Sequence, residues 1–299
     1  MHYICIIIIL HLSESVKRIF LLLVFINFSI LAYFISRPYS FYKSIAVRYI
    51  DSFDQLVIND SIGHDTLIIN TIKFLPPRKS TVYTIKKNQR IERLLEGGGN
   101  CSNQSVAMGA ILSGKKQRYQ VVHLMPVPEF LEGSGHTVLQ TIYKDSLAIF
   151  DLLGRSLLKK NNHSITYRDL DSLANENAIL SIETNILNSN RDSVEQYYTH
   201  PFKTFIIGIV PDEEYNKFYS FNKWLPIVTQ ETRYTQAFYY AVACMFNKLP
   251  HIYVQKKDEK KLSSYPIYTV DRILSFTLII TTWLSLGVLI FTIIRKAVI

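Results

Sequence analysis

The sequence has little cysteine and none of the common metal-binding motifs. Its three cysteines, Cys5, Cys101 and Cys244, are too few and too widely spaced for a disulfide framework. Neither His-Glu-x-x-His nor Cys-x-x-Cys occurs in the chain, and these spacings are typical of zinc sites and related metal centres. We therefore expect no disulfide-stabilised scaffold, no metal site and no cofactor.

Nucleic-acid-binding motifs are also missing, although the chain is basic. The formal net charge is +9, and a strongly basic chain can indicate nucleic-acid binding. However, the sequence has no zinc-finger spacing, no aromatic RNA-binding motif and no basic helix with interleaved aromatic residues. Basic residues beside membrane spans explain the charge, because anionic lipids attract them. We expect membrane lipid, and no nucleic acid, as a partner.

Two long runs lack any charged residue, residues 19–36 and residues 273–294. A bilayer core about 30 Å thick needs roughly 20 apolar residues in a helix. Residues 273–294 are therefore expected to form a transmembrane helix. Residues 19–36 are expected to form another, within an N-terminal segment of residues 1–36. The alternative is a cleaved signal peptide, but the run is long for one and no small-residue cleavage site follows it.

Basic residues at the outer ends of both runs indicate an orientation. Lys17 and Arg18 precede the first run, and Arg295 and Lys296 follow the second. Such residues favour the cytoplasmic side of a membrane. Basic residues also flank the inner ends, but a long central segment counts less in this rule. We therefore expect both termini in the cytoplasm and the central domain outside it.

The segment between the two runs is expected to hold one globular domain, at residues 45–250. It shows no internal repeat and no long low-complexity linker. Residues 254–272 are rich in lysine and are expected to form a charged juxtamembrane linker before the second span.

One junction in this domain places a cysteine where a glycine-rich loop becomes a helix. Residues Glu96 to Leu112 read EGGGNCSNQSVAMGAIL. Apolar residues follow Cys101 at helical spacing, Asn100 is a typical N-cap residue, and Gly114 suits the C-terminal end. A helix N-terminus favours a thiolate. The junction therefore indicates a reactive rather than a structural cysteine.

The residues after this helix predict strands, at 118–124, 136–143 and 146–153. Lys144 and Asp145 suit a two-residue turn between the last two strands. With that turn, His136 and Asp151 share a face as diagonal neighbours about 7–8 Å apart. An imidazole and a carboxylate can meet across this gap. We predict Cys101 as nucleophile, His136 as general base and acid, and Asp151 as the orienting carboxylate.

This pattern resembles the transglutaminase-like superfamily, whose fold is related to that of papain-type cysteine proteases. The family pattern is Gly-x-Cys opening a helix, then Gly and Arg-x-Val, then His opening a strand and Asp ending the next. The residues that carry the resemblance are Gly99-Asn100-Cys101, Gly114, Arg118-Tyr119-Gln120-Val121, Gly135-His136 and Asp151. The resemblance implies an α+β fold with a helix packed on an antiparallel sheet, here between two transmembrane helices.

The resemblance also implies a membrane-anchored cysteine enzyme that acts on amide or peptide bonds of a peptide or protein substrate. The reaction would pass through a thioester, which water would hydrolyse or an amine would accept as an acyl group. Both outcomes remain open at this point. Asn100, Ser102 and Gln104 are expected in the neighbourhood of the substrate or the oxyanion. One alternative is a catalytically inactive module that binds peptides or proteins of the cell envelope. Another is a structural membrane protein with an incidental cysteine.

Overall fold

The computed structural model describes ten segments of the chain, residues 14–56, 63–74, 91–92, 94–96, 99–126, 135–160, 163–170, 181–183, 205–222 and 233–298. The chain divides into two compact units. The first, called the helical unit, comprises Met1–Ile45, Thr232–Asn247 and Pro266–Ile299. The second, called the sheet unit, comprises Ala46–Glu231 and Lys248–Tyr265.

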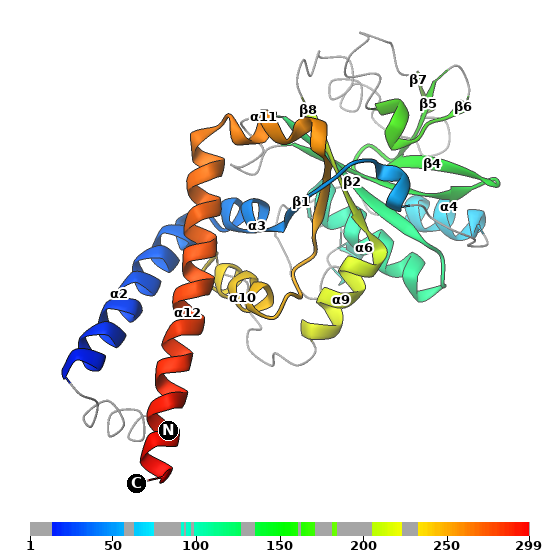
Figure 1. Ribbon diagram of the computed structural model, residues 1–299. Helices are drawn as coiled ribbons and strands as arrows, with labels where there is room; N and C mark the ends of the chain where they lie inside the picture. Colours follow the sequence, from blue (N-terminus) through cyan, green and yellow to red (C-terminus); the bar gives the residue numbers. More distant parts are fainter. Residues whose placement is uncertain are drawn as a thin grey trace. The chain divides into compact units, whose positions relative to one another are not determined.

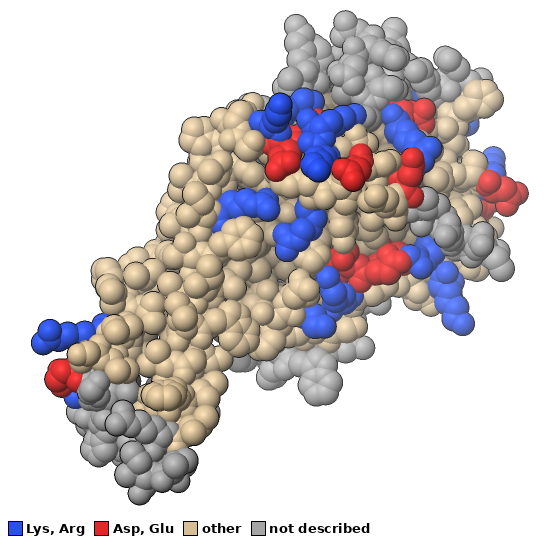
Figure 2. All heavy atoms as spheres, viewed as in Figure 1, with Lys and Arg blue, Asp and Glu red and all other residues tan. Residues whose placement is uncertain are grey.

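The helical unit is built around two long apolar helices. Its helices are α2 (Glu14–Ser36), most of α3 (Pro38–Ala46), α10 (Arg233–Met245) and α12 (Pro266–Val298). α2 and α12 lie side by side, and α10 contacts both (Figure 1). Residues 14–36 and 266–294 are long and apolar enough to cross a membrane. On the face in Figure 2, charged side chains are sparse along these two helices.

Polar contacts show that α2 and α12 run antiparallel. Tyr33, near the end of α2, donates a hydrogen bond to Asp271, near the start of α12, at 2.6 Å. Earlier in α2, Asn27 accepts hydrogen bonds from Thr281 and Thr282, which lie later in α12. Interhelical hydrogen bonds of this kind hold helices together in lipid. The C-terminal end of α2 and the N-terminal end of α12 therefore lie at the same end of this helix pair.

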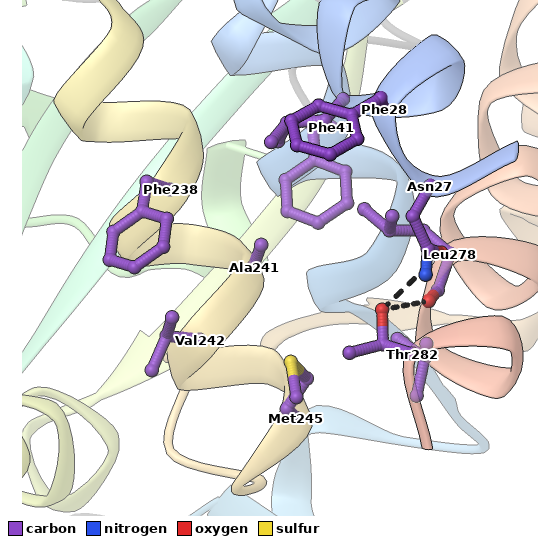
Figure 3. Close-up of a pocket in the computed structure, with 11 residues that line it drawn as sticks. Asn27, Phe28, Phe41, Phe238, Ala241, Val242, Met245, Leu278 and Thr282 are labelled. Carbon is purple, nitrogen blue, oxygen red and sulfur yellow. Dashed lines mark hydrogen bonds between the residues drawn. The ribbon is translucent and has the colours of Figure 1, made fainter. Parts of the chain in front are cut away.

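An apolar pocket of about 210 Å³ lies among α2, α3, α10 and α12 (Figure 3). Phe28, Ala241 and Leu278 contribute to its apolar lining, and Asn27 contributes polar atoms. Nearby, Tyr42 of α3 and Tyr240 of α10 stack with ring centroids 5.0 Å apart. α10 thus packs with the long helices. The predicted globular domain at residues 45–250 therefore differs from the structure, which groups residues 232–247 with the helical unit.

The sheet unit contains one mixed sheet. Its described strands are β1 (Val47–Ile50), β2 (Tyr119–Pro126), β3 (His136–Tyr143), β4 (Ser146–Asp151), β5 (Ser156–Lys160), β6 (His163–Ser164), β7 (Ser181–Glu183), β8 (Phe205–Pro211) and β9 (Ile252–Gln255). Their order is β1-β9-β8-β2-β3-β4-β5-β6, with β7 also paired to β5. The fold is α+β, as predicted.

The strand directions differ from the prediction in one place. The other described strand pairs are antiparallel, but β1 and β9 pair in parallel, with Val47 opposite Ile252. The expectation of a purely antiparallel sheet is therefore wrong. β1 and β9 come from the two ends of the unit, so the whole intervening chain serves as the crossover that a parallel pair requires.

Short helices surround the sheet: η1 (Phe53–Leu56), α4 (Asp65–Phe74), α6 (Cys101–Gly114), α9 (Asp212–Asn222), η3 (Lys256–Asp258) and α11 (Glu259–Ser263). The predicted helix from Cys101 to Gly114 is confirmed. So is the hairpin of β3 and β4, in which Tyr143 pairs with Ser146. Its turn residues, Lys144 and Asp145, have φ of 49° and 57°, as a type I′ turn requires.

The sheet unit has a contiguous apolar core. One cluster of buried residues consists of Phe53, Val122, Leu124, Val138, Ile149, Leu158, Ile165, Tyr167, Leu170, Ile207 and Ile209. α6 packs against β2 and β3 (Figure 1). The contact is close at Gly109, because a Cβ atom there would overlap the ring of buried Tyr119. A small residue at this position therefore sets how near α6 lies to the sheet.

The charged segment at residues 254–272, predicted as a juxtamembrane linker, forms regular secondary structure. It continues β9, forms η3 and α11, and then begins α12 at Pro266. Val254 and Leu262 are fully buried, whereas Lys256, Lys257, Lys260 and Lys261 are exposed. The lysines occupy the outer side of structured elements, and the few apolar residues between them fix those elements to the sheet unit.

We predict opposite effects for two alanine substitutions in α6. Gly109→Ala places a methyl group against Tyr119 and should lower the free energy of unfolding by about 1–3 kcal/mol. Gly114→Ala meets open space and should be neutral or stabilising by up to about 1 kcal/mol. Thermal unfolding of the purified variants in detergent would measure both. Equal stability of the two variants would contradict the close α6–β2 contact.

Candidate functional site

Local backbone geometry places Cys101 at the N-terminus of α6. The Asn100 side chain accepts a hydrogen bond from the Asn103 N–H at 2.9 Å, so Asn100 is the N-cap, as predicted. Gly99 has φ of +95°, and a Cβ atom there would also collide with the Asn103 side chain. Glycine is therefore required at this position. Cys101 follows as the first helical residue and is partly buried.

A second glycine precedes the histidine. Gly135 has φ of +117°, and a Cβ atom there would press against the Leu124 carbonyl oxygen. β3 begins at the next residue, His136, which pairs with Leu124 of β2. His136 is only 3% exposed. The strand start thus holds a buried imidazole.

Asp151 lies at the end of β4 and is fixed through both carboxylate oxygens. Oδ2 lies 2.8 Å from Nε2 of His136, and Oδ1 accepts a hydrogen bond from the Gly154 N–H at 2.9 Å. Asp151 is 1% exposed. The predicted meeting of His136 and Asp151 across the hairpin is confirmed. The bond to Asp151 commits Nε2 of the imidazole, so Nδ1 is the ring nitrogen left for the cysteine.

The thiol of Cys101 interacts electrostatically with the His136 imidazole. Burial alone would raise the pKa of this thiol, but the hydrogen bond and the charge of His136 lower it, and a backbone hydrogen bond from Thr137 lowers it further. The net pKa of Cys101 is below the ordinary value. The positive end of the α6 dipole acts in the same direction. Cys101 is therefore set up to ionise more readily than an ordinary thiol.

The pKa of His136 moves in the opposite direction. Burial would lower it, but the charge of Asp151 and its hydrogen bond raise it, and Cys101 contributes in the same sense. The net pKa of His136 is well above the ordinary value. A lowered thiol pKa beside a raised imidazole pKa favours a thiolate–imidazolium pair. That pair is the reactive form of a cysteine nucleophile.

The structure adds residues that the sequence analysis missed. Ser105 donates a hydrogen bond from Oγ to the Thr137 carbonyl at 3.2 Å, which ties α6 to β3 beside the site. Ser105 follows Cys101 by four residues, so helical spacing could have identified it. Thr137 lowers the pKa of Cys101 through its backbone, so the identity of its side chain could not have indicated this role. Gly154 donates its N–H to Asp151, three residues earlier. Aspartate followed by glycine in a turn is a recognisable local sequence pattern.

The three predicted neighbours of the site have different surroundings. The side chain of Asn100 is used as the helix cap. Ser102 lies in the first turn of α6 and is partly buried. Gln104 is 6% exposed, and its side-chain oxygen has no hydrogen-bond partner. Within the described segments, no three His, Cys, Asp or Glu side chains are grouped so that they could hold a metal ion.

Arg118, which belongs to the Arg-x-Val part of the motif, forms ion pairs with α9. Its Nε bonds to Asp212 at 3.0 Å, and its guanidinium also pairs with Glu213. These carboxylates lie in the first turn of α9, where negative charge suits the helix dipole. Arg118 therefore anchors the start of β2 to α9, which is a structural role.

Comparisons with models of protein families, with curated proteins and with solved structures found no match to this chain. The chemical interpretation therefore depends on the arrangement of Cys101, His136 and Asp151. A hydrogen bond links His136 to Asp151, and His136 in turn lowers the pKa of the Cys101 thiol. Such a set can activate a thiol for attack on a carbonyl carbon and return a proton to a leaving group.

The pH dependence of alkylation tests this arrangement. Cys101 should react with iodoacetamide with a midpoint below that of an ordinary thiol, about pH 8.5. In His136→Ala the midpoint should rise, because burial remains while the hydrogen bond and positive charge are lost. Rates would be measured at the Cys101 peptide by mass spectrometry, with Cys244→Ser as the control that leaves the profile unchanged. An unchanged midpoint in His136→Ala would contradict the proposed thiol–imidazole interaction.

Proposed function

We propose that this chain is a membrane-anchored, transglutaminase-like cysteine enzyme that acts on amide or peptide bonds through a thioester intermediate. The observation that carries the proposal is the position of His136, which is hydrogen-bonded to the Asp151 carboxylate and lowers the pKa of the Cys101 thiol. The order of α6, β2, β3 and β4, with these residues at a helix start, a strand start and a strand end, supports a transglutaminase-like core.

The first half of the reaction forms the thioester. The Cys101 thiolate attacks the carbonyl carbon, so a C–S bond forms and the carbonyl oxygen becomes an oxyanion. The Asn103 N–H is used by the Asn100 cap, so the backbone N–H groups of Cys101 and Ser102 at the start of α6 are the ones that can stabilise this negative charge. The C–N bond then breaks, and the imidazolium of His136 gives its proton to the departing amine. An acyl group is left on the sulfur.

The second half releases the acyl group. Water or an amine attacks the thioester carbonyl, and neutral His136 takes the proton from the attacking group. The C–S bond breaks and the Cys101 thiolate is restored beside the imidazolium. Asp151 keeps the imidazole in one orientation throughout and stabilises its charged form. Water gives peptidase or amidase activity, whereas an amine gives acyl transfer or cross-linking.

An inactive binding module of the same fold is the alternative from another class. Such a module needs no activated thiol. Burying a charged histidine–aspartate pair costs free energy unless the pair is well hydrogen-bonded. In the sheet unit, both oxygens of Asp151 are bonded and the pKa of Cys101 is lowered. These features favour the enzyme over the binding module.

The two apolar helices support attachment to a membrane. The antiparallel arrangement of α2 and α12 puts their outer ends on one side of the pair, which agrees with both termini lying in the cytoplasm. Lys17 and Arg18 are near one outer end, and Arg295 and Lys296 are near the other. We propose that the sheet unit lies outside the cytoplasm, where its peptide or protein substrate would belong to the cell envelope.

Acyl transfer to hydroxylamine tests the enzyme proposal. The full-length protein would be incubated with a library of acetylated peptide amides and hydroxylamine, and hydroxamates and hydrolysis products would be identified by mass spectrometry. His136→Ala should reduce turnover roughly 10²- to 10⁴-fold, and Cys101→Ala should abolish it. The ratio of hydroxamate to hydrolysis product distinguishes a transferase from a hydrolase. Turnover that survives in Cys101→Ala would exclude the thioester mechanism.

Protease accessibility in sealed membranes tests the orientation. Protease added to the cytoplasmic face of inverted vesicles should leave the sheet unit intact, whereas protease added to cells with a permeable outer layer should digest it. Tags at both termini, detected with antibodies, should be digested in the inverted vesicles and protected in the cells. A sheet unit digested in the inverted vesicles would place the domain in the cytoplasm and contradict the proposed topology.

A further inference from the structure

Gln104 differs from the other buried glutamines in the described part of the sheet unit. Gln117, Gln120 and Gln140 each have hydrogen bonds at both the amide nitrogen and the amide oxygen. Gln104 is 6% exposed, and its Oε1 is buried without a partner. An unsatisfied buried acceptor destabilises a folded protein. The chain holds this polar group where an apolar side chain would be less costly.

Helical geometry places this carboxamide near the nucleophile. Gln104 follows Cys101 by three residues in α6, and residues three apart lie on neighbouring parts of the same helix face. Side chains in helices lean toward the N-terminus, so we expect the Gln104 side chain to reach over the turn that contains Cys101. Its backbone N–H is already bonded to the Asn100 carbonyl, so only the side chain is available to a ligand.

We propose that Gln104 Oε1 accepts a hydrogen bond from an amide N–H of the substrate, so that the site prefers secondary amides over esters. This inference rests on the proposed function and names the class of bond that the site selects. Oε1 can only accept a hydrogen bond, so its partner must carry an N–H or O–H group. A secondary amide supplies an N–H beside the reacting carbonyl, whereas an ester has an oxygen there that cannot donate.

Burial makes this selection effective. A substrate N–H that reaches Oε1 would satisfy an acceptor that is otherwise unpaired. A substrate without that N–H would leave the acceptor unpaired in the complex. Sites that are built to hydrogen-bond a substrate discriminate strongly against analogues that lack the matching group.

A matched pair of small electrophiles tests the proposal. N-methyliodoacetamide carries a secondary N–H, and methyl iodoacetate has an ester oxygen in its place. With either probe the Cys101 thiolate displaces iodide, so a C–S bond forms and the C–I bond breaks. Second-order rate constants at the Cys101 peptide would be measured for the full-length protein in detergent. Dividing each rate by that of glutathione removes the intrinsic difference between the probes.

The normalised rate for the amide should exceed that for the ester by about 2- to 10-fold in the unaltered protein. Gln104→Leu should bring the ratio close to one while keeping the low alkylation midpoint of Cys101. Gln55→Leu, a substitution at an exposed glutamine, should leave the ratio unchanged. Gln104→Met provides a second unbranched apolar replacement if Gln104→Leu unfolds.

Two outcomes would overturn the proposal. The first is an amide-to-ester ratio near one in the unaltered protein, and the second is an equal ratio in the unaltered protein and Gln104→Leu. If the low alkylation midpoint persists in either case, only the role of Gln104 fails and the activated thiol stands. If the midpoint itself is that of an ordinary thiol, the proposed function fails and the inference fails with it.

Discussion

The buried hydrogen bond between His136 and Asp151 is the interaction on which the site depends. A charged imidazole in apolar surroundings is unfavourable without a partner of opposite charge. Asp151 supplies that partner at 2.8 Å, and Gly154 holds the second carboxylate oxygen. The lowered pKa of Cys101 depends in turn on the charge of His136. The reactivity of the thiol is therefore decided by a residue that does not contact the sulfur in the proposed mechanism.

The reactivity of the thiol therefore depends on the register of the strands that carry His136 and Asp151. A slip of one residue in the hairpin of β3 and β4 would turn Asp151 to the opposite face of the sheet. The two-residue turn, with φ of 49° at Lys144 and 57° at Asp145, prevents such a slip. The position of α6 is set separately, by the contact of Gly109 with Tyr119 and by the bond from Ser105 to Thr137. Packing and backbone geometry thus fix the distances among the three reacting groups.

The sequence was most informative where short-range rules apply. The bounds of α6, the cap at Asn100 and the hairpin register follow from neighbouring residues, so they could be predicted. The parallel pairing of β1 with β9 joins residues far apart in the chain and has no local signal. Composition misled in the lysine-rich segment, where Val254 and Leu262 decide the structure. The unpaired state of Gln104 depends on its surroundings, so spacing alone could not reveal it.

The position of β9 in the sheet has a consequence for synthesis of the chain. β9 lies between β1 and β8, yet it is the last strand to leave the ribosome. Until residue 255 is made, β1 and β8 each lack a neighbour, and unpaired strand edges invite aggregation. Pairings between distant segments also form slowly. Each unit is built from segments that lie early and late in the chain. Once one unit has folded, its contacts hold distant segments together, so the other unit has a shorter loop to close.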